Sequence, residues 1–103
     1  MTLADRRKQH IDFNEKVNNA KSILIAGAGV VGVELAGEFA AKFGAYKEKK
    51  IGICMRGDRL LPGHPAKAGR IAEDFLVRNN VQIHKKTPFG PTTAKELEYD
   101  LTI

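Results

Sequence analysis

Residues 22–36 read SILIAGAGVVGVELA, a short apolar run followed by three glycines in the spacing GxGxxG. The run at 22–26 is continuous and apolar, which is typical of a strand in a parallel sheet that is buried on both faces. After the glycines, apolar residues recur at helical spacing as far as Phe43, and Gly44 follows where a C-terminal helix cap is expected. We therefore expect a strand, a tight glycine turn and a helix, in that order.

The alternation of strands and helices continues toward the C-terminus. Apolar residues recur on one helix face after Pro65, a plausible first helical position, and Asn79 and Asn80 end that helix. The elements predicted after the first helix are a strand, a loop, this helix, a strand, a loop and a strand, over residues 50–55, 57–64, 65–78, 81–83, 87–93 and 101–103. Strands separated by such helices indicate right-handed crossovers and a parallel sheet.

Apolar residues at helical spacing before the first strand predict a lead-in helix over residues 1–20. The predicted fold class is therefore α/β: a Rossmann-like three-layer domain with a mostly parallel sheet and an N-terminal lead-in helix. A chain of 103 residues is long enough for one domain, so we expect residues 1–103 to form a single domain. Because the chain stops within an apolar run at Ile103, we expect it to be a fragment excised from a larger protein.

Composition and charge narrow the function classes. Lys and Arg number 17 against 12 Asp and Glu, giving a net charge of +5, but the positive charges are spread and there is no Trp among them to stack on bases. A basic nucleic-acid binder is therefore an unfavoured alternative. No apolar stretch approaches the ~20 residues that a membrane span needs. The charged first residues do not resemble a signal peptide, and one cysteine permits no internal disulfide, so we expect a cytoplasmic or otherwise intracellular protein.

The glycine turn has the chemistry of a dinucleotide site. The first glycine permits a tight turn, the second lets a pyrophosphate approach the backbone, and the third lets the helix pack closely on the strand. The N–H groups at the helix start, together with the helix dipole, then face the phosphates. The residues predicted to bind the pyrophosphate are Gly27, Ala28, Gly29, Val30, Val31 and Gly32. The alternative is a glycine turn that binds nothing.

The end of the second strand bears on the choice of cofactor. A carboxylate about 20 residues after the last glycine accepts hydrogen bonds from the adenosine ribose in NAD and FAD sites. This chain has Met55 and Arg56 in that stretch, and the nearest acid, Asp58, lies beyond a glycine. Arg56 and Arg59 suit a 2′-phosphate, so binding of NAD(P)H with a slight preference for NADPH is expected, and dual use is possible. The alternative is that both are solvated loop arginines.

Two segments carry a resemblance to a known family. The stretches AKSILIAGAGVVGVELAGEFAAKF and KKIGICMRGDRLLPGHPAKAGRIAEDFLVRNNVQI resemble the pyridine-nucleotide domain of the two-dinucleotide FAD-dependent oxidoreductases. The GDRLLP loop, the PAKAG helix start and the lead-in helix resemble the AIF-like AMID/ferroptosis-suppressor branch, which is related to the type II NADH dehydrogenases. The resemblance covers residues 5–103, nearly the whole chain.

The resemblance implies a function for the parent protein. In this family a small NAD(P)H domain is inserted into a larger FAD domain, and hydride passes from NAD(P)H to flavin and on to a quinone. It also implies that Glu34 reaches the nicotinamide amide, although an acid at this place also interacts favourably with the helix dipole. Ala36 and Arg56 are similar to NADP-using members, whereas Gly32 is shared with NAD users. The FAD domain and the family's late glycine motif lie outside this chain, so no catalytic residue is predicted and the fragment alone is expected to be inactive.

The remaining reactive residues give weak signals. Cys54 alternates with isoleucines in a predicted strand, which favours a packed thiol over a reactive one. His10, His64 and His84 are too scattered to predict a metal site. The favoured hypothesis is therefore an NAD(P)H-binding domain whose partner is the FAD domain of the same parent chain. A non-catalytic dinucleotide-sensing or interaction module is the alternative.

Overall fold

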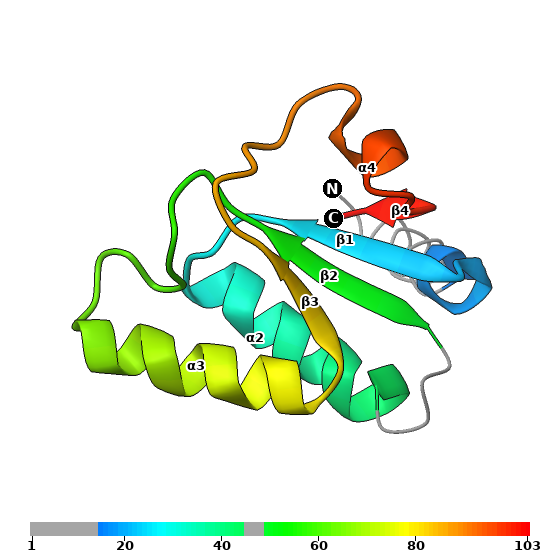
Figure 1. The fold of residues 1–103 in the computed structure, drawn as a ribbon. Helices are drawn as coiled ribbons and strands as arrows, with labels where there is room; N and C mark the ends of the chain where they lie inside the picture. Colours follow the sequence, from blue (N-terminus) through cyan, green and yellow to red (C-terminus); the bar gives the residue numbers. More distant parts are fainter. Residues whose placement is uncertain (1–14, 45–48) are drawn as a thin grey trace, which may run out of the picture.

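The computed structural model describes residues 15–44 and 49–103 and places four strands in one parallel sheet (Figure 1). In chain order these are β1 (Ser22–Ala26), β2 (Lys50–Cys54), β3 (Val81–His84) and β4 (Leu101–Thr102). Their order across the sheet is β3-β2-β1-β4, and every neighbouring pair runs parallel. The chain thus builds outward from β1 to β3, then crosses back to add β4 on the other side of β1.

Helices α2 (Val30–Phe39) and α3 (Ala66–Arg78) cover one face of the sheet (Figure 1). α2 continues into a π-helical turn, η1 (Ala40–Gly44), so Gly44 lies within the helical segment instead of following it as the predicted cap. The larger core lies between these helices and the sheet, and its fully buried side chains include Ile23, Ile25, Ile51, Ile53 and Leu76. Alternate residues of β1 and β2 supply this core because successive strand side chains point to opposite faces.

The opposite face of the sheet carries a smaller cluster of Leu24, Cys54 and Tyr99, against which part of the short helix α4 (Thr93–Glu96) packs. A Cβ built on Gly52 would overlap the Tyr99 hydroxyl, so glycine makes room here for the tyrosine ring. The sheet is therefore covered on both sides, and the predicted Rossmann-like α/β class with a mostly parallel sheet is confirmed.

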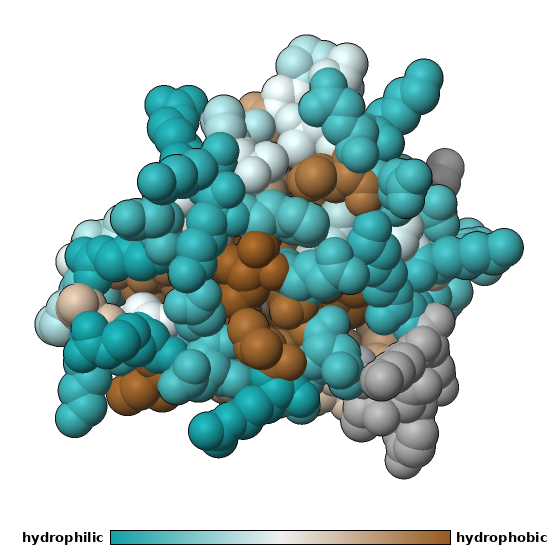
Figure 2. Space-filling view, viewed as in Figure 1, coloured by the Kyte–Doolittle hydropathy of each residue, from teal (hydrophilic) through white to brown (hydrophobic). Residues whose placement is uncertain are grey.

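The outer surface of α3 carries exposed apolar side chains. Ile71, Phe75 and Val77 are more than half exposed. Figure 2 shows apolar residues gathered between β3 and α3 in the middle of the viewed face, with hydrophilic residues around them. Such patches often mark interaction sites, and Phe75 also lies close to α2, since a Cβ built on Gly37 would be 3.7 Å from its Cε1.

Several predicted boundaries shift in the structure. Pro65 is the N-cap of α3 rather than its first residue, and β2 ends at Cys54 instead of Met55. α4 was not predicted, because its four residues follow a stretch that contains two prolines and a glycine. Of the predicted lead-in helix over 1–20, residues 15–19 are helical, and the part before residue 15 lies outside the described residues.

The described end of the lead-in helix is fixed to the core. Val17 and Ala20 are buried in the larger core. Lys49 Nζ donates to the carbonyl oxygens of Asn18, at 2.8 Å, and Ala20, at 2.5 Å. A lysine at this place satisfies carbonyl groups that the end of a helix leaves without partners. The chain therefore enters β1 from a defined direction.

Candidate functional site: the glycine turn and its two hollows

The turn between β1 and α2 begins with a backbone conformation that favours glycine. Gly27 has φ +125°, a conformation that residues with a Cβ rarely adopt. Its N–H donates to the carbonyl oxygen of Cys54 at 3.0 Å, and the next carbonyl, that of Ala28, accepts from the N–H of Leu61 at 2.9 Å. The turn is therefore held between the end of β2 and the loop that follows it.

Gly29 leaves open space in front of α2. It is the N-cap of that helix, with φ −76° and ψ −176°, and offers no side chain to cap the N–H groups of the first turn. A Cβ built on Gly29 would meet nothing within 4 Å. Val30 and Val31, which follow it, are 45% and 78% exposed. The helix start thus offers accessible N–H donors and a positive dipole end, the arrangement that binds anionic groups.

Gly32 serves packing. A Cβ built on this residue would overlap the carbonyl oxygen of Gly27 and would lie 3.6 Å from Cγ2 of Ile25. Only glycine therefore allows the first turn of α2 to lie this close to the strand that precedes it. Two of the three glycines are thus required by the fold, whereas Gly29 keeps a space free.

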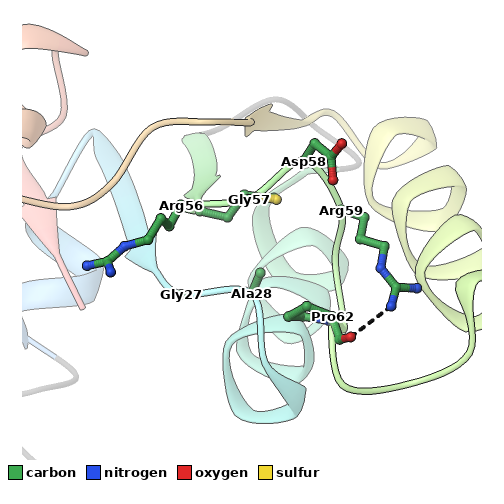
Figure 3. Close-up of a pocket in the computed structure, with 8 residues that line it drawn as sticks. Gly27, Ala28, Arg56, Gly57, Asp58, Arg59 and Pro62 are labelled. Atoms are coloured by element: carbon green, nitrogen blue, oxygen red, sulfur yellow. Dashed lines mark hydrogen bonds between the residues drawn. The ribbon is translucent and has the colours of Figure 1, made fainter.

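Two hollows lie on either side of the glycine turn. The first, called here the β2 hollow, is lined by Gly27, Ala28, Met55, Arg56, Gly57, Asp58, Arg59 and Pro62 (Figure 3). The second, the β4 hollow, is lined by Ile25, Ala26, Gly27, Gly29, Val30, Val31, Gly32, Leu35 and Ile103. Both open at the carboxyl ends of the strands, beside the point where the chain reverses its direction across the sheet. In open α/β sheets ligands bind at such points.

The two arginines predicted to meet a 2′-phosphate do not converge. Arg56 and Arg59 extend toward opposite ends of the β2 hollow (Figure 3). Arg59 Nη2 donates to the carbonyl oxygen of Pro62 at 2.7 Å, while Nη1 is buried with no hydrogen-bond partner in the described part of the chain. Arg56 is exposed. A ligand at the Arg56 end of the hollow would therefore meet that arginine alone of the two.

Met55, which the sequence spacing places where an NAD site would have its acid, is held by the surrounding backbone. It is 4% exposed, its N–H donates to the His84 carbonyl oxygen at 3.1 Å, and its carbonyl oxygen accepts from the Thr87 N–H at 2.6 Å. Asp58 is exposed in the same hollow. Glu34, on the second turn of α2, is exposed and is not among the residues that line either hollow.

A pair of titratable residues on the second sheet face was not predicted. His84 Nε2 lies 2.8 Å from the Tyr99 hydroxyl, and the two rings meet edge to face. Burial, with a smaller contribution from the charge of Lys50, lowers the pKa of His84. Burial, and to a smaller extent the nearby Cys54, raises the pKa of Tyr99 to about 12. The only sequence signal for this contact is Gly52, whose missing side chain makes room for the ring.

The other reactive residues show no catalytic arrangement. Cys54 is free and buried, and burial raises the pKa of its thiol, which suits a packed thiol rather than a nucleophile. His64 is exposed in the loop before α3, and His10 lies outside the described residues. Over residues 15–44 and 49–103 no group of three His, Cys, Asp or Glu residues is placed to hold a metal ion. None of the helices described there is long and apolar enough to cross a membrane.

Solved structures similar to this chain show its fold class, and a family model shows its family. Two solved structures share its fold with a TM-score of 0.56: an FAD-dependent pyridine nucleotide-disulphide oxidoreductase from Desulfovibrio vulgaris and the reduced CoADR-RHD of Bacillus anthracis. The first is 22% identical and covers 66% of this chain and 16% of its own; the second is 14% identical and covers 82% and 14%. At these identities the likeness shows the α/β fold alone.

A family model described as pyridine nucleotide-disulphide oxidoreductase matches residues 2–100. The chain therefore belongs to this family. It is 38% identical over 101 residues to oxidoreductase ptaL of Pestalotiopsis fici, a match that covers 96% of this chain and 27% of the relative. It is 33% identical over 76 residues to apoptosis-inducing factor homolog A of Dictyostelium discoideum, covering 70% and 19%. The chain thus spans about a quarter or less of the length of these relatives.

Proposed function

We propose that this chain is the NAD(P)H-binding domain of an FAD-dependent oxidoreductase that passes hydride from NAD(P)H to flavin and on to a quinone-type acceptor. The observation that carries the proposal is the open space at Gly29, in front of the uncapped start of α2. A pyrophosphate placed there receives hydrogen bonds from backbone N–H groups, and no side chain excludes it. The family membership of the chain supports the same reading.

The two hollows suit the two halves of a dinucleotide. With the pyrophosphate at Gly29, the adenosine half enters the β2 hollow and the nicotinamide half enters the β4 hollow, whose walls are largely apolar. Nicotinamide when bound supplies the hydride, and flavin held by another part of the parent protein accepts it. The role of this chain is to hold and orient the cofactor. Glu34 completes the site only if the nicotinamide amide extends as far as the second turn of α2.

The β2 hollow favours a cofactor with a 2′-phosphate. Buried Met55 offers no carboxylate to the ribose hydroxyls, and exposed Arg56 supplies a positive charge beside them. Arg59 contributes less, because one of its nitrogens is already bonded to the Pro62 carbonyl oxygen. We therefore propose that the chain binds both cofactors with a modest preference for NADPH.

The relatives support a proposal for the parent protein and its branch of the family. The match to an apoptosis-inducing factor homolog supports the AIF-like AMID/ferroptosis-suppressor branch, and the greater length of the relatives supports a parent in which residues 1–103 are one domain beside an FAD domain. A single free cysteine fits a reducing, intracellular location, cytoplasmic or otherwise.

Calorimetric titration of the purified chain with NADH and with NADPH tests the proposal. We expect saturable binding of one molecule of either cofactor, and competition between the two. Gly63→Val is the control for a substitution at Gly29 and should bind both cofactors as the unaltered chain does. Gly63 lies outside both hollows, and a Cβ built on it, like one built on Gly29, would meet nothing within 4 Å. Absence of binding of both cofactors at millimolar concentration, in a chain whose circular dichroism shows the α/β fold, would refute the assignment.

A further inference from the structure

The loop after β3 is fastened to the rim of the β2 hollow. Beyond the last paired residues, Cys54 and His84, the N–H of Lys86 donates to the carbonyl oxygen of Gly57 at 2.7 Å. Arg56 and Lys86 each stand two residues beyond that pair, in the loops that follow the neighbouring strands β2 and β3. The backbone of Lys86 is thus fixed directly beside a residue that lines the hollow.

Two successive lysines in this loop have different surroundings. Lys85 Nζ lies 2.7 Å from Oε1 of Glu73 on α3, so its charge is paired. Lys86 is exposed and forms no ion pair within the described residues. It has φ +52°, a backbone conformation that is uncommon for a residue with a long side chain. The loop therefore keeps one paired lysine and one unpaired lysine beside the hollow.

The backbone hydrogen bond holds Lys86 next to Gly57, the residue that follows Arg56 and lines the hollow. Arg56 and Lys86 are both exposed cations, and Asp58 is the acid that lines the same hollow. Neighbouring like charges repel each other, and an anion that binds between them removes that repulsion. A phosphate monoester carries up to two negative charges and several acceptor oxygens, which matches two cations from separate loops.

We propose that Lys86 is a specificity-determining residue that binds the 2′-phosphate of NADPH together with Arg56. This inference rests on the proposed function, because it requires the adenosine half of the cofactor in the β2 hollow. It adds the loop after β3 to a cofactor site that the sequence predicts only from the GxGxxG motif and the end of β2. Lys85, paired with Glu73, has no such role.

The test uses adenosine fragments, so that it is independent of the nicotinamide half. The probes are adenosine 2′,5′-bisphosphate and AMP, which differ only in the 2′-phosphate, with inorganic phosphate as a third probe. Each is titrated into the unaltered chain and into Lys86→Gln, Lys86→Arg and the matched control Lys85→Gln. Circular dichroism of each variant checks that the fold is retained.

We expect Lys86→Gln to weaken binding of adenosine 2′,5′-bisphosphate about tenfold, since a charged hydrogen bond at an exposed site lies at the low end of its range. Binding of AMP should change less than twofold, Lys86→Arg should retain affinity, and Lys85→Gln should match the unaltered chain. The preference for the bisphosphate should also decrease as salt is added, because salt screens exposed charges.

Three results would overturn the inference while leaving the proposed function intact. The first is an equal loss of affinity for both adenosine probes in Lys86→Gln, and the second is no loss of affinity for either. The third is that inorganic phosphate binds as tightly as the bisphosphate. Failure of the unaltered chain to bind AMP, NADH and NADPH would instead contradict the proposed function itself. The two failures are therefore distinguishable in one set of titrations.

Discussion

Substituting Gly29 by valine separates cofactor binding from folding. Its backbone angles, φ −76° and ψ −176°, are available to any residue, and a new Cβ would meet no atom within 4 Å. Replacing glycine at an N-cap by an apolar residue costs at most about 1 kcal/mol. The valine side chain would, however, fill the space that a pyrophosphate needs. Loss of two hydrogen bonds to charged oxygens, each contributing about 1.5–3 kcal/mol, weakens binding by at least about a hundredfold.

The matched substitution is Gly32→Val. It should lower the stability of the fold more than Gly29→Val does, and weaken cofactor binding less. Here the new Cβ overlaps the Gly27 carbonyl oxygen, and relieving such overlap by shifting the backbone costs about 1–3 kcal/mol or more. Urea unfolding followed by circular dichroism measures the stability of both variants, and calorimetry with NADH and NADPH measures binding. Gly29→Val with unchanged affinity and unchanged stability would refute the assignment of the phosphate site, whatever Gly32→Val shows.

Four further predictions concern charge, pH and turnover. Arg56→Glu should weaken NADPH binding about tenfold and leave NADH within about threefold, in titrations at low salt. An equal effect on both cofactors would show that Arg56 does not contact the 2′-phosphate. The folded state lowers the pKa of His84, so the unfolded chain takes up a proton at His84 first as pH falls below about 6.5. The free energy of unfolding should therefore decrease below that pH. Because it raises the pKa of Tyr99 to about 12, stability should also fall between about pH 10 and 12, and urea titrations of Tyr99→Phe should lack this alkaline loss. The purified, flavin-free chain should not oxidise NAD(P)H with a quinone acceptor, whereas the full-length parent should; a parent that binds NAD(P)H without flavin would support a sensing module instead.

Local patterns predicted the part of the fold that positions the site. The buried run at 22–26, the three glycines and the helix after them form one contiguous unit, so their geometry follows from neighbouring residues. The same holds for α3, whose apolar face and terminal asparagines are visible in the sequence. The predicted packing role of Gly32 agrees with the overlap that a Cβ there would cause.

Features that depend on distant contacts were not predictable in the same way. The sequence places Arg56 and Arg59 three residues apart and suggests a shared ligand, but the Pro62 carbonyl oxygen holds one guanidinium away from the other. The approach of Lys86 to the hollow depends on a backbone hydrogen bond to Gly57, 29 residues earlier in the chain. Neither contact has a periodicity or a motif that would reveal it.

The second face of the sheet contributes to the site through β4. Ser22 Oγ accepts a hydrogen bond from the Asp100 N–H at 2.8 Å, and the Tyr99 hydroxyl reaches His84 on β3. The first contact holds the start of β4 to β1 and the second holds it to β3, and the Ile103 N–H then donates to the Leu24 carbonyl oxygen at 2.9 Å. Ile103 lines the β4 hollow, where we place the nicotinamide half. Tyr99 and Ser22 therefore act on the proposed site without touching it, because they determine where its β4 wall stands.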